Sequence, residues 1–291
     1  YRFLRRVAAT GCRHVVVIGG NHDSPTFLDA PAELLKMLDV HVVGAATDSP
    51  AEEVITLRDP EGAVELLVCA VPYLRDRDLR RAEAGESPED KERKLAEGIR
   101  RHYAAVVEAA LQRNVLLPQP VPVVGMGHLF TAGGQTVDGD GVRELYVGSL
   151  AHVTAGIFPE ALDYVALGHL HVPQPVGGRE FVRYSGSPLA MGFGEAAQAK
   201  QVCVVEFAPE KTVSLLPVPV FQRLERVTGD WPQVEARLTA LKATGESVWM
   251  EVTHTGHEVM DDLRERLESL TAGSALEVLK AWNTGHPGGL L

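Results

Sequence analysis

Cysteine is scarce in this chain: three occur among 291 residues, at Cys12, Cys69 and Cys203. Because they are odd in number and far apart, they argue against a disulfide framework, and they lack the paired spacing of a structural zinc site. We therefore expect a reduced protein of the cytoplasm. Long apolar runs are also missing, since none approaches the roughly 20 residues that cross a bilayer. We accordingly expect no membrane partner.

Basic residues are outnumbered: 28 Lys and Arg face 39 Asp and Glu, which gives a formal net charge of −11. A protein that binds nucleic acid by itself usually carries a basic footprint. This composition argues against DNA binding over the whole surface, but it leaves room for a local patch. One candidate patch is interleaved with acids: Arg75, Asp76, Arg77, Asp78, Arg80 and Arg81. It is either a track for phosphates or, as the mixed charges favour, a solvated helix face.

Hydrophobic residues make up 45% of the chain, which is enough for a substantial core. Early in the chain, apolar strands alternate with helices: strands at 14–18, 40–44, 53–57 and 64–73, and helices at 26–38 and 88–113. Ser87 and Pro88 mark the start of the longer helix, as its cap and its first-turn proline. Strands then follow one another at 121–126, 163–171, 181–187 and 200–207. This order predicts an α/β layered domain with mixed sheets.

Residues 212–220, rich in β-branched residues and proline, predict an exit from that domain. The pattern after them predicts a helix, a strand and a second helix. We therefore expect two domains, 1–220 and 221–291, the second being a small α/β cap. At the other end, residues 1–10 are typical of the close of an amphipathic helix that has no capping residue. We expect the chain to be a piece of a longer protein.

Three strand ends share one pattern, an apolar run followed by glycine and histidine: VVVIGGNHD at 15–23, VVGMGH at 123–128 and VALGHLH at 165–171. In α/β folds, functional groups gather beyond the carboxyl ends of strands, and glycine permits a sharp turn there. Each piece alone has an ordinary structural explanation. Asn-His-Asp is commonly a local turn, and a lone histidine after a strand is usually a hydrogen-bonded polar group. Their conjunction favours a shared site.

The residue types at these ends favour a hydrolytic metal centre. His169 and His171 alternate, so in an extended segment both imidazoles point to one side. Histidine nitrogen with an amide oxygen and no thiolate suits manganese, iron or zinc, and a pair of such ions clamps a displacement at phosphorus. Two ions also require carboxylates, and we expect Asp23 to orient His22 rather than to ligate metal. The other histidines lack this context, and we expect structural roles for them: His14, His41, His102, His152, His254, His257 and His286.

The motifs GNHD, GH and GHLH, in this order, resemble those of the calcineurin-like metallophosphoesterase superfamily. Flanking segments narrow the resemblance to the SbcD nuclease family over roughly residues 1–220: GGNHDSPTFL, GHLFTAGG, RELYVGSL, DYVALGHLHVPQPV and RYSGSPLAMGFGE. The resemblance implies a two-sheet β-sandwich flanked by helices, with two divalent metal ions at the strand ends, manganese foremost. It also implies 3′–5′ exonuclease action on double-stranded DNA and endonuclease action on hairpins and single strands, in DNA repair, recombination and replication.

The resemblance assigns a catalytic pair, with His22 at the scissile phosphate and Asp23 as the residue that fixes its orientation. It also assigns four metal ligands, the first three on one ion and the last on the other: Asn21, His128, His169 and His171. As partners it implies DNA and an SbcC-type, SMC-like ATPase, with a homodimer of nuclease subunits inside a heterotetramer.

One departure from the family pattern bears on activity. The family's Asp-x-His and Gly-Asp motifs, which supply the bridging carboxylate, do not precede Asn21 here. We therefore expect them upstream of Tyr1, and we expect little or no activity from residues 1–291 alone. Two other functions stay open. A small-molecule phosphodiesterase would use the same generic metal core, and a non-catalytic scaffold would keep the fold without the metals.

Overall fold

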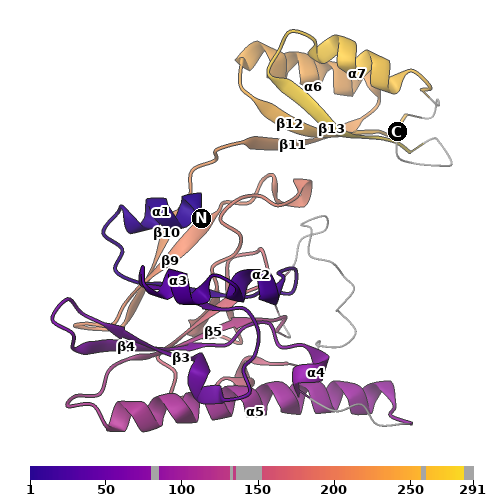
Figure 1. The fold of residues 1–291 in the computed structure, drawn as a ribbon. Coiled ribbons are helices and arrows are strands. Elements are labelled where there is room, and N and C mark those ends of the chain that lie inside the picture. Colours follow the sequence, from indigo (N-terminus) through magenta and orange to yellow (C-terminus); the bar gives the residue numbers. More distant parts are fainter. Residues whose placement is uncertain (80–84, 132–133, 136–152, 257–259, 285–291) are drawn as a thin grey trace. The chain divides into compact units, whose positions relative to one another are not determined.

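The computed structural model describes residues 1–79, 85–131, 134–135, 153–256 and 260–284 (Figure 1). These residues form two compact units, and each is described by itself. The first unit contains the described residues up to 135 together with 153–186 and 203–215, and the second contains 187–202 and 216–284. Some expectations lie outside the described residues: the RELYVGSL segment, Arg80 and Arg81 of the candidate patch, and His152, His257 and His286. Of the helices within the described ranges, none combines the length and apolar character needed to span a bilayer.

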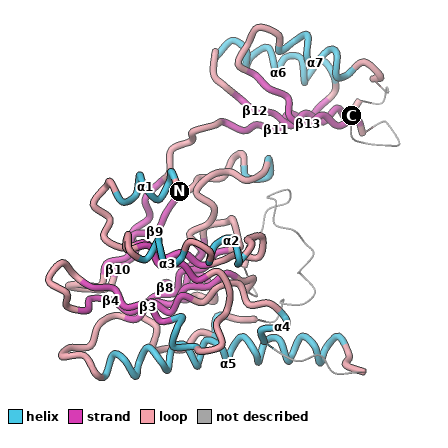
Figure 2. Tube along the Cα trace, in the orientation of Figure 1, coloured by secondary structure: helices cyan, strands magenta, loops and turns pink. Residues whose placement is uncertain are grey.

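A six-stranded mixed sheet forms the centre of the first unit (Figure 2). Its strands, in spatial order, are β3 (Val54–Arg58), β4 (Val64–Ala70), β5 (Val123–His128), β6 (Tyr164–Gly168), β8 (Arg179–Tyr184) and β7 (Gln174–Val176). The four middle strands run parallel, and each edge strand is antiparallel to its neighbour. The carboxyl ends of β5 and β6 therefore lie at the same edge of the sheet.

The long helix α5 (Pro88–Val115) covers one face of this sheet (Figure 1). Its predicted start is confirmed, because the Ser87 hydroxyl oxygen accepts the N–H of Asp90 at 3.1 Å. The helix buries an apolar stripe in a core that it shares with β4, β5 and β6: Leu95, Ile99, Tyr103, Val106, Val107 and Ala110. Removal of this stripe from water holds the helix on the sheet.

A separate two-stranded parallel sheet, β1 (Val15–Ile18) and β2 (Val40–Val43), packs on the opposite face. Val68 of β4 shares a small core with Val43, whereas its neighbour Cys69 belongs to the core under α5. This alternation follows from the two-residue period of a strand. The architecture is thus mixed α/β, as expected from the sequence, and the complete two-sheet sandwich stays a prediction.

The single helix predicted at 26–38 is wrong. Two short helices occupy this stretch, α2 (Pro25–Asp29) and α3 (Ala32–Lys36). Pro31 lies between them and has no N–H to continue the hydrogen-bond ladder, so the first helix ends before it. The last bond of α2 runs from Ala30 to the Thr26 carbonyl at 3.1 Å.

The remaining elements of the chain before residue 218 are short: α1 (Arg2–Ala8), η1 (Pro50–Glu53), α4 (Asp76–Leu79), η3 (Ala155–Ile157), η4 (Phe193–Glu195), β9 (Gln201–Glu206) and β10 (Thr212–Pro217). β9 and β10 pair in a two-stranded sheet, so the predicted exit segment is itself largely a strand. On α4, Arg77 lies 3.6 Å from the Asp78 carboxylate and is largely exposed. This contact agrees with a solvated face of mixed charge for the described part of the candidate patch.

The cap region contains more strands than predicted. Its order is β11 (Arg223–Gly229), α6 (Trp231–Thr244), β12 (Val248–His254), α7 (Leu263–Thr271) and β13 (Leu276–Asn283). The three strands pair in parallel in this order. Both helices pack on the sheet through one core, which includes Leu238, Met250 and Leu267. The predicted helix–strand–helix pattern is therefore present, but a strand on each side of it was missed.

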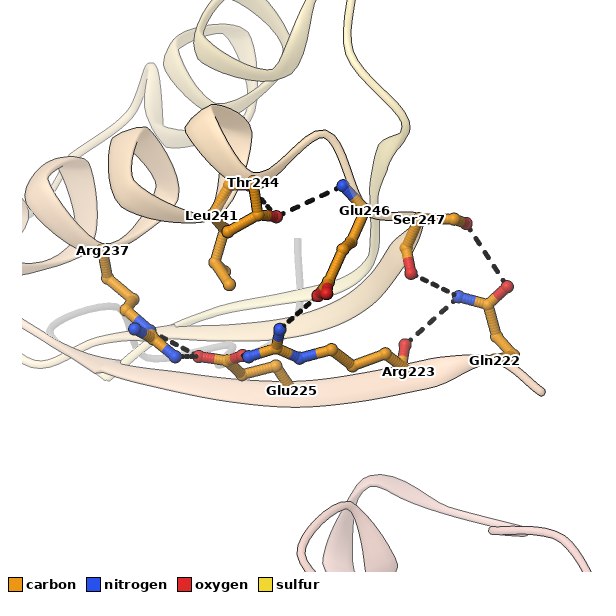
Figure 3. A network of polar contacts seen from close by, with 8 residues as sticks. All are labelled: Gln222, Arg223, Glu225, Arg237, Leu241, Thr244, Glu246 and Ser247. Atoms are coloured by element: carbon orange, nitrogen blue, oxygen red, sulfur yellow. Dashed lines mark hydrogen bonds and ion pairs between the residues drawn. The ribbon is translucent and has the colours of Figure 1, made fainter. Parts of the chain in front are cut away.

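Charged side chains explain why β11 lacks the apolar pattern of a strand (Figure 3). The Arg223 guanidinium contacts Glu246 at 2.5 Å and Glu225 at 2.9 Å, and Arg237 of α6 contacts Glu225 at 2.5 Å. Such partly exposed ion pairs contribute only about 0–1 kcal/mol each. The strand is held instead by its parallel pairing with β12 and by buried Val227.

Candidate functional site

The turn after β1 is closely packed at two glycines. Gly19 donates its N–H to the Val43 carbonyl at 2.9 Å. A side chain at Gly19 would collide with the Gly44 carbonyl oxygen, and a Cβ at Gly20 would lie 2.8 Å from Cε1 of His128. Both positions need glycine because the neighbouring backbone and the imidazole ring approach so closely. The two glycines thus bring the turn against the end of β5.

Asp23 closes this turn. Its Oδ2 accepts the N–H of Gly20 at 2.7 Å, and the next residue, Ser24, caps α2 by accepting the N–H of Phe27 at 3.4 Å. Within the described part of the chain, no hydrogen bond joins Asp23 to His22, which is exposed. Asp23 therefore makes the local-turn contact that the ordinary structural explanation of this motif predicts.

Three predicted metal ligands lie side by side. The Nε2 atom of His128, at the end of β5, is 2.8 Å from Oδ1 of Asn21 in the turn after β1. The His169 ring, just beyond β6, stands edge-on to the His128 ring with centroids 5.2 Å apart. Parallel pairing of β5 with β6 explains this meeting, because His128 is in register with Gly168. The structure therefore brings together residues from all three Gly-His strand ends.

Burial lowers the pKa of His128 to about 4. The imidazoles of His169, His22 and His171 lower this pKa further, and the Asp23 carboxylate opposes them by raising it. Each of these groups is thus close enough to affect His128 electrostatically. At pH 7 the ring of His128 is neutral, with Nε2 donating to Oδ1 of Asn21. A metal ion bound between these two atoms would take the place of that proton.

The sequence argument for His169 and His171 is wrong in its geometry. We expected both residues in an extended segment, where alternation points the rings to one side. β6 ends at Gly168, and His169 has a φ of 106°, far from the extended region. Leu170 is buried between the two histidines along the chain. Such a φ is rare for a residue with a side chain and marks a constrained backbone at this strand end.

Tyr103 supports the site from α5, and sequence reasoning missed it. Its hydroxyl donates to the Met126 carbonyl at 3.2 Å, two residues before His128. A side chain at Gly127 would collide with the same hydroxyl oxygen. The helical spacing of Tyr103 marks it only as a core residue, so no signal in the sequence points to this contact. The phenol fixes the backbone that carries His128.

The donor set fits a divalent metal ion. Two ligands that lie about 2.1 Å from one ion at right angles are about 3 Å apart, close to the 2.8 Å between His128 Nε2 and Asn21 Oδ1. The residues around Asn21 and His128 include few carboxylates that could act as ligands. Among the described residues, only one cluster places three imidazole or carboxylate ligand atoms within 4.8 Å of one another, and it lies at the amino ends of β1 and β2: His14, Asp39 and His41.

Comparisons with known proteins agree with one another. The profile SbcD_C, described as "Type 5 capsule protein repressor C-terminal domain", matches residues 220–285. The SbcD subunit of nuclease SbcCD from Escherichia coli (strain K12) is 35% identical over 286 residues, which cover 96% of this chain and 68% of that protein. Proteins of the same name from Rhodobacter capsulatus and Bacillus subtilis are 33% and 34% identical over 78% and 72% of this chain, and 56% and 51% of theirs.

Proposed function

This chain belongs to the SbcD family of nuclease subunits, and on that premise we propose that the protein that carries residues 1–291 hydrolyses phosphodiester bonds of DNA with the residues that gather beyond β1, β5 and β6. One observation carries the proposal. Asn21 and His128, 107 residues apart in the chain, meet at 2.8 Å, and burial keeps the imidazole neutral at pH 7 by lowering its pKa to about 4. A polar pair of this kind at strand ends suits a metal centre.

We assign roles as follows. Asn21, His128 and His169 would hold one divalent ion and His171 a second, with manganese as the first choice. When bound, such ions supply a hydroxide nucleophile at neutral pH and balance the charge of the phosphate. His22, exposed on the turn, would stand at the scissile phosphate, where it donates a proton to the leaving oxygen or stabilises developing charge. Asp23 would place His22 through the turn that it closes with Gly20.

The finer activity and the partners are also proposals. We assign 3′–5′ exonuclease action on double-stranded ends and endonuclease action on hairpins and single strands, in DNA repair, recombination and replication. The relatives are named as one component of nuclease SbcCD, which supports a larger complex. We propose an SbcC-type, SMC-like ATPase as partner and a homodimer of this chain within a heterotetramer. Phosphate contacts made by the ATPase and by a local groove would reconcile DNA binding with the net charge of −11.

We further propose that residues 1–220 form the phosphoesterase domain and residues 221–291 a cap that orients DNA. The profile match at 220–285 supports this division, as does the packing of α6 and α7 with β12 in a core of their own. In this organisation the cap contributes no metal ligand, since all six assigned residues precede residue 172.

The test is cleavage of an end-labelled DNA duplex with Mn²⁺, with the protein that carries residues 1–291, with and without its ATPase partner. We expect His22→Ala to lower the rate at least about 100-fold, because removal of a proton-transfer group typically loses two to four powers of ten. Gln112→Ala, on the exposed side of α5, is the control and should cleave as the wild type does.

Two outcomes would replace the proposal. Equal rates on the duplex and on a small chromogenic phosphodiester, both abolished by His128→Asn, would indicate a small-molecule phosphodiesterase. Binding of DNA without cleavage of either substrate, in the presence of the ATPase and Mn²⁺, would indicate a non-catalytic scaffold. Cleavage of duplex that survives His22→Ala at the wild-type rate would remove His22 from the mechanism.

A further inference from the structure

A second cluster of ligand-type side chains lies at the opposite end of the β1–β2 pair. His14 directly precedes β1, while Asp39 precedes β2 and His41 is the second residue of that strand. The parallel register pairs Val15 with Val40 and Val16 with His41. His14 and Asp39 stand one position before this paired register, so the pairing brings the three residues together at the amino ends of the two strands. Their ligand atoms lie within 4.8 Å of one another.

The His14 ring is poised as a ligand by its own hydrogen bond. Its Nε2 lies 2.7 Å from the Arg58 carbonyl oxygen, and because a carbonyl can only accept, Nε2 carries the proton. In the neutral ring Nδ1 therefore presents a lone pair. Nδ1 is buried, has no hydrogen-bond partner among the described residues, and lies 3.7 Å from Oδ1 of Asp39.

Two electron-pair donors, Nδ1 of His14 and Oδ1 of Asp39, thus face each other. A proton on Nδ1 or a metal ion between the two atoms would interact with both of them. The proton makes a simple ion pair, but 3.7 Å is longer than a hydrogen bond allows. A ring that donates its other N–H to a backbone carbonyl is the usual arrangement of a metal-bound histidine. The nearby His41 imidazole supplies a third ligand, which an ion pair does not need.

The distances and the surroundings suit a small cation. Two ligands on one ion, each about 2.1 Å from it, lie at most about 4.2 Å apart. The 3.7 Å pair already meets this limit, and the widest spacing of 4.8 Å closes with a small side-chain movement. His41 also borders a cavity of about 270 Å³ whose lining contains three carboxylates and one ammonium group: Asp29, Glu33, Glu52 and Lys36. The balance of charge there favours a cation.

We propose that His14, Asp39 and His41 form a binding site for one divalent transition-metal ion of the zinc, cobalt or nickel type. Two imidazoles and one carboxylate prefer these ions to manganese, which binds such donors more weakly. The ion joins the amino ends of β1 and β2. It lies at the other end of β1 from Asn21 and His22, so this site is separate from the proposed nuclease centre and does not depend on it.

The test counts bound zinc in the chelator-stripped chain by isothermal titration calorimetry. The double variant His128→Ala/His169→Ala removes two imidazoles of the other centre and serves as the background. We expect one zinc ion in this background and its loss when His41→Ala is added. Co²⁺ in the same background should give a visible d–d absorption band that His41→Ala abolishes. Asp39→Asn should weaken zinc at least about 10-fold, because it removes the only anionic ligand.

Asp39→Asn also guards against misfolding. Asp39 has a φ of 55° and its side chain is 64% exposed, and asparagine tolerates this backbone as well as aspartate does. Equal zinc stoichiometry and affinity in the background, in His41→Ala and in Asp39→Asn would overturn the proposal. Absence of any zinc in the background chain would overturn it as well. DNA cleavage is measured separately, so failure here leaves the nuclease proposal to its own test.

Discussion

The two ends of the β1–β2 pair carry the same kinds of side chain in different surroundings. At the carboxyl ends, the half-buried His128 from the neighbouring sheet lies against Asn21 and Gly20. At the amino ends, His14 and His41 stand beside a largely exposed carboxylate. Partial burial thus favours a neutral imidazole beside an amide at one end, whereas a largely exposed carboxylate stands beside the two imidazoles at the other. Residue type alone therefore does not define a metal site, since burial and the available hydrogen bonds decide which ligands occur.

The largest expected effect is a loss of unfolding free energy as the pH is lowered, and it arises from His128 at the carboxyl ends of the strands. The pKa of His128 is lowered to about 4 by burial, whereas an unfolded histidine has a pKa of about 6.5. The unfolded chain therefore takes up the proton first. The unfolding free energy is unaffected by His128 above about pH 6.5 and falls as the pH drops from there toward 4. Below pH 4 both states are protonated and no more is lost, so the total loss of unfolding free energy is about 3 kcal/mol.

Urea unfolding of wild type and of His128→Asn at pH 7, 5.5 and 4.5 measures this effect. The variant lacks the half-buried imidazole, so its unfolding free energy should fall less over this range. Parallel pH profiles for the two proteins would mean that the folded surroundings do not lower the pKa of His128, and the contrast between the two strand ends would disappear.

Zinc bound at the amino ends of β1 and β2 should stabilise the folded chain by slightly less than acidification destabilises it. A ligand at 100 times its Kd raises the unfolding free energy by about 2.7 kcal/mol when it binds only the folded chain. In the His128→Ala/His169→Ala background, thermal unfolding with and without zinc should show this increase. The additional change His41→Ala should remove it. An equal increase in stability with and without His41→Ala would mean that zinc binds at another site.

Gly127→Ala tests how the carboxyl end is held in place. The added methyl group collides with the Tyr103 hydroxyl, and overpacking of this kind destabilises by about 1–3 kcal/mol. Tyr103→Phe removes the hydroxyl and should recover part of the loss. A double-mutant cycle from chemical denaturation gives the coupling between the two positions. Additive effects would mean that the ring and the strand adjust independently.

The smallest expected effect is at Asp23. Asp23→Ala removes the acceptor for the Gly20 N–H and should lower the unfolding free energy by about 1 kcal/mol. Because the Asp23 carboxylate raises the pKa of His128, its loss should lower that pKa further. An NMR titration of the His128 ring protons measures the shift. An unchanged or higher pKa would contradict the proximity of these two groups.

Local signals in the sequence predict some of this structure well. Ser87 and Pro88 mark the start of α5 because capping depends on neighbouring residues only. The three glycine–histidine strand ends likewise predict that Asn21, His128 and His169 lie together, since functional groups in α/β folds gather beyond the carboxyl ends of strands. The assigned roles of these residues stay predictions until they are tested in solution.

Other features depend on contacts that no local pattern reveals. The strand β11 was missed because its charged residues are balanced by side chains on α6 and beyond, among them Arg237 and Glu246. His14 and His41 were expected to have structural roles because their proximity arises only from the pairing of β1 with β2. The unusual backbone at His169 also depends on its surroundings, and simple alternation along a strand does not predict it.

The contact between Tyr103 and Gly127 also limits how this protein can evolve. The phenol occupies the space that any side chain at position 127 would need. A lineage that gains a larger residue there must first lose the hydroxyl at position 103, so the order of the two substitutions matters. Tyr103→Phe is the permissive step, and positions 24 residues apart in this chain should change together in distant relatives.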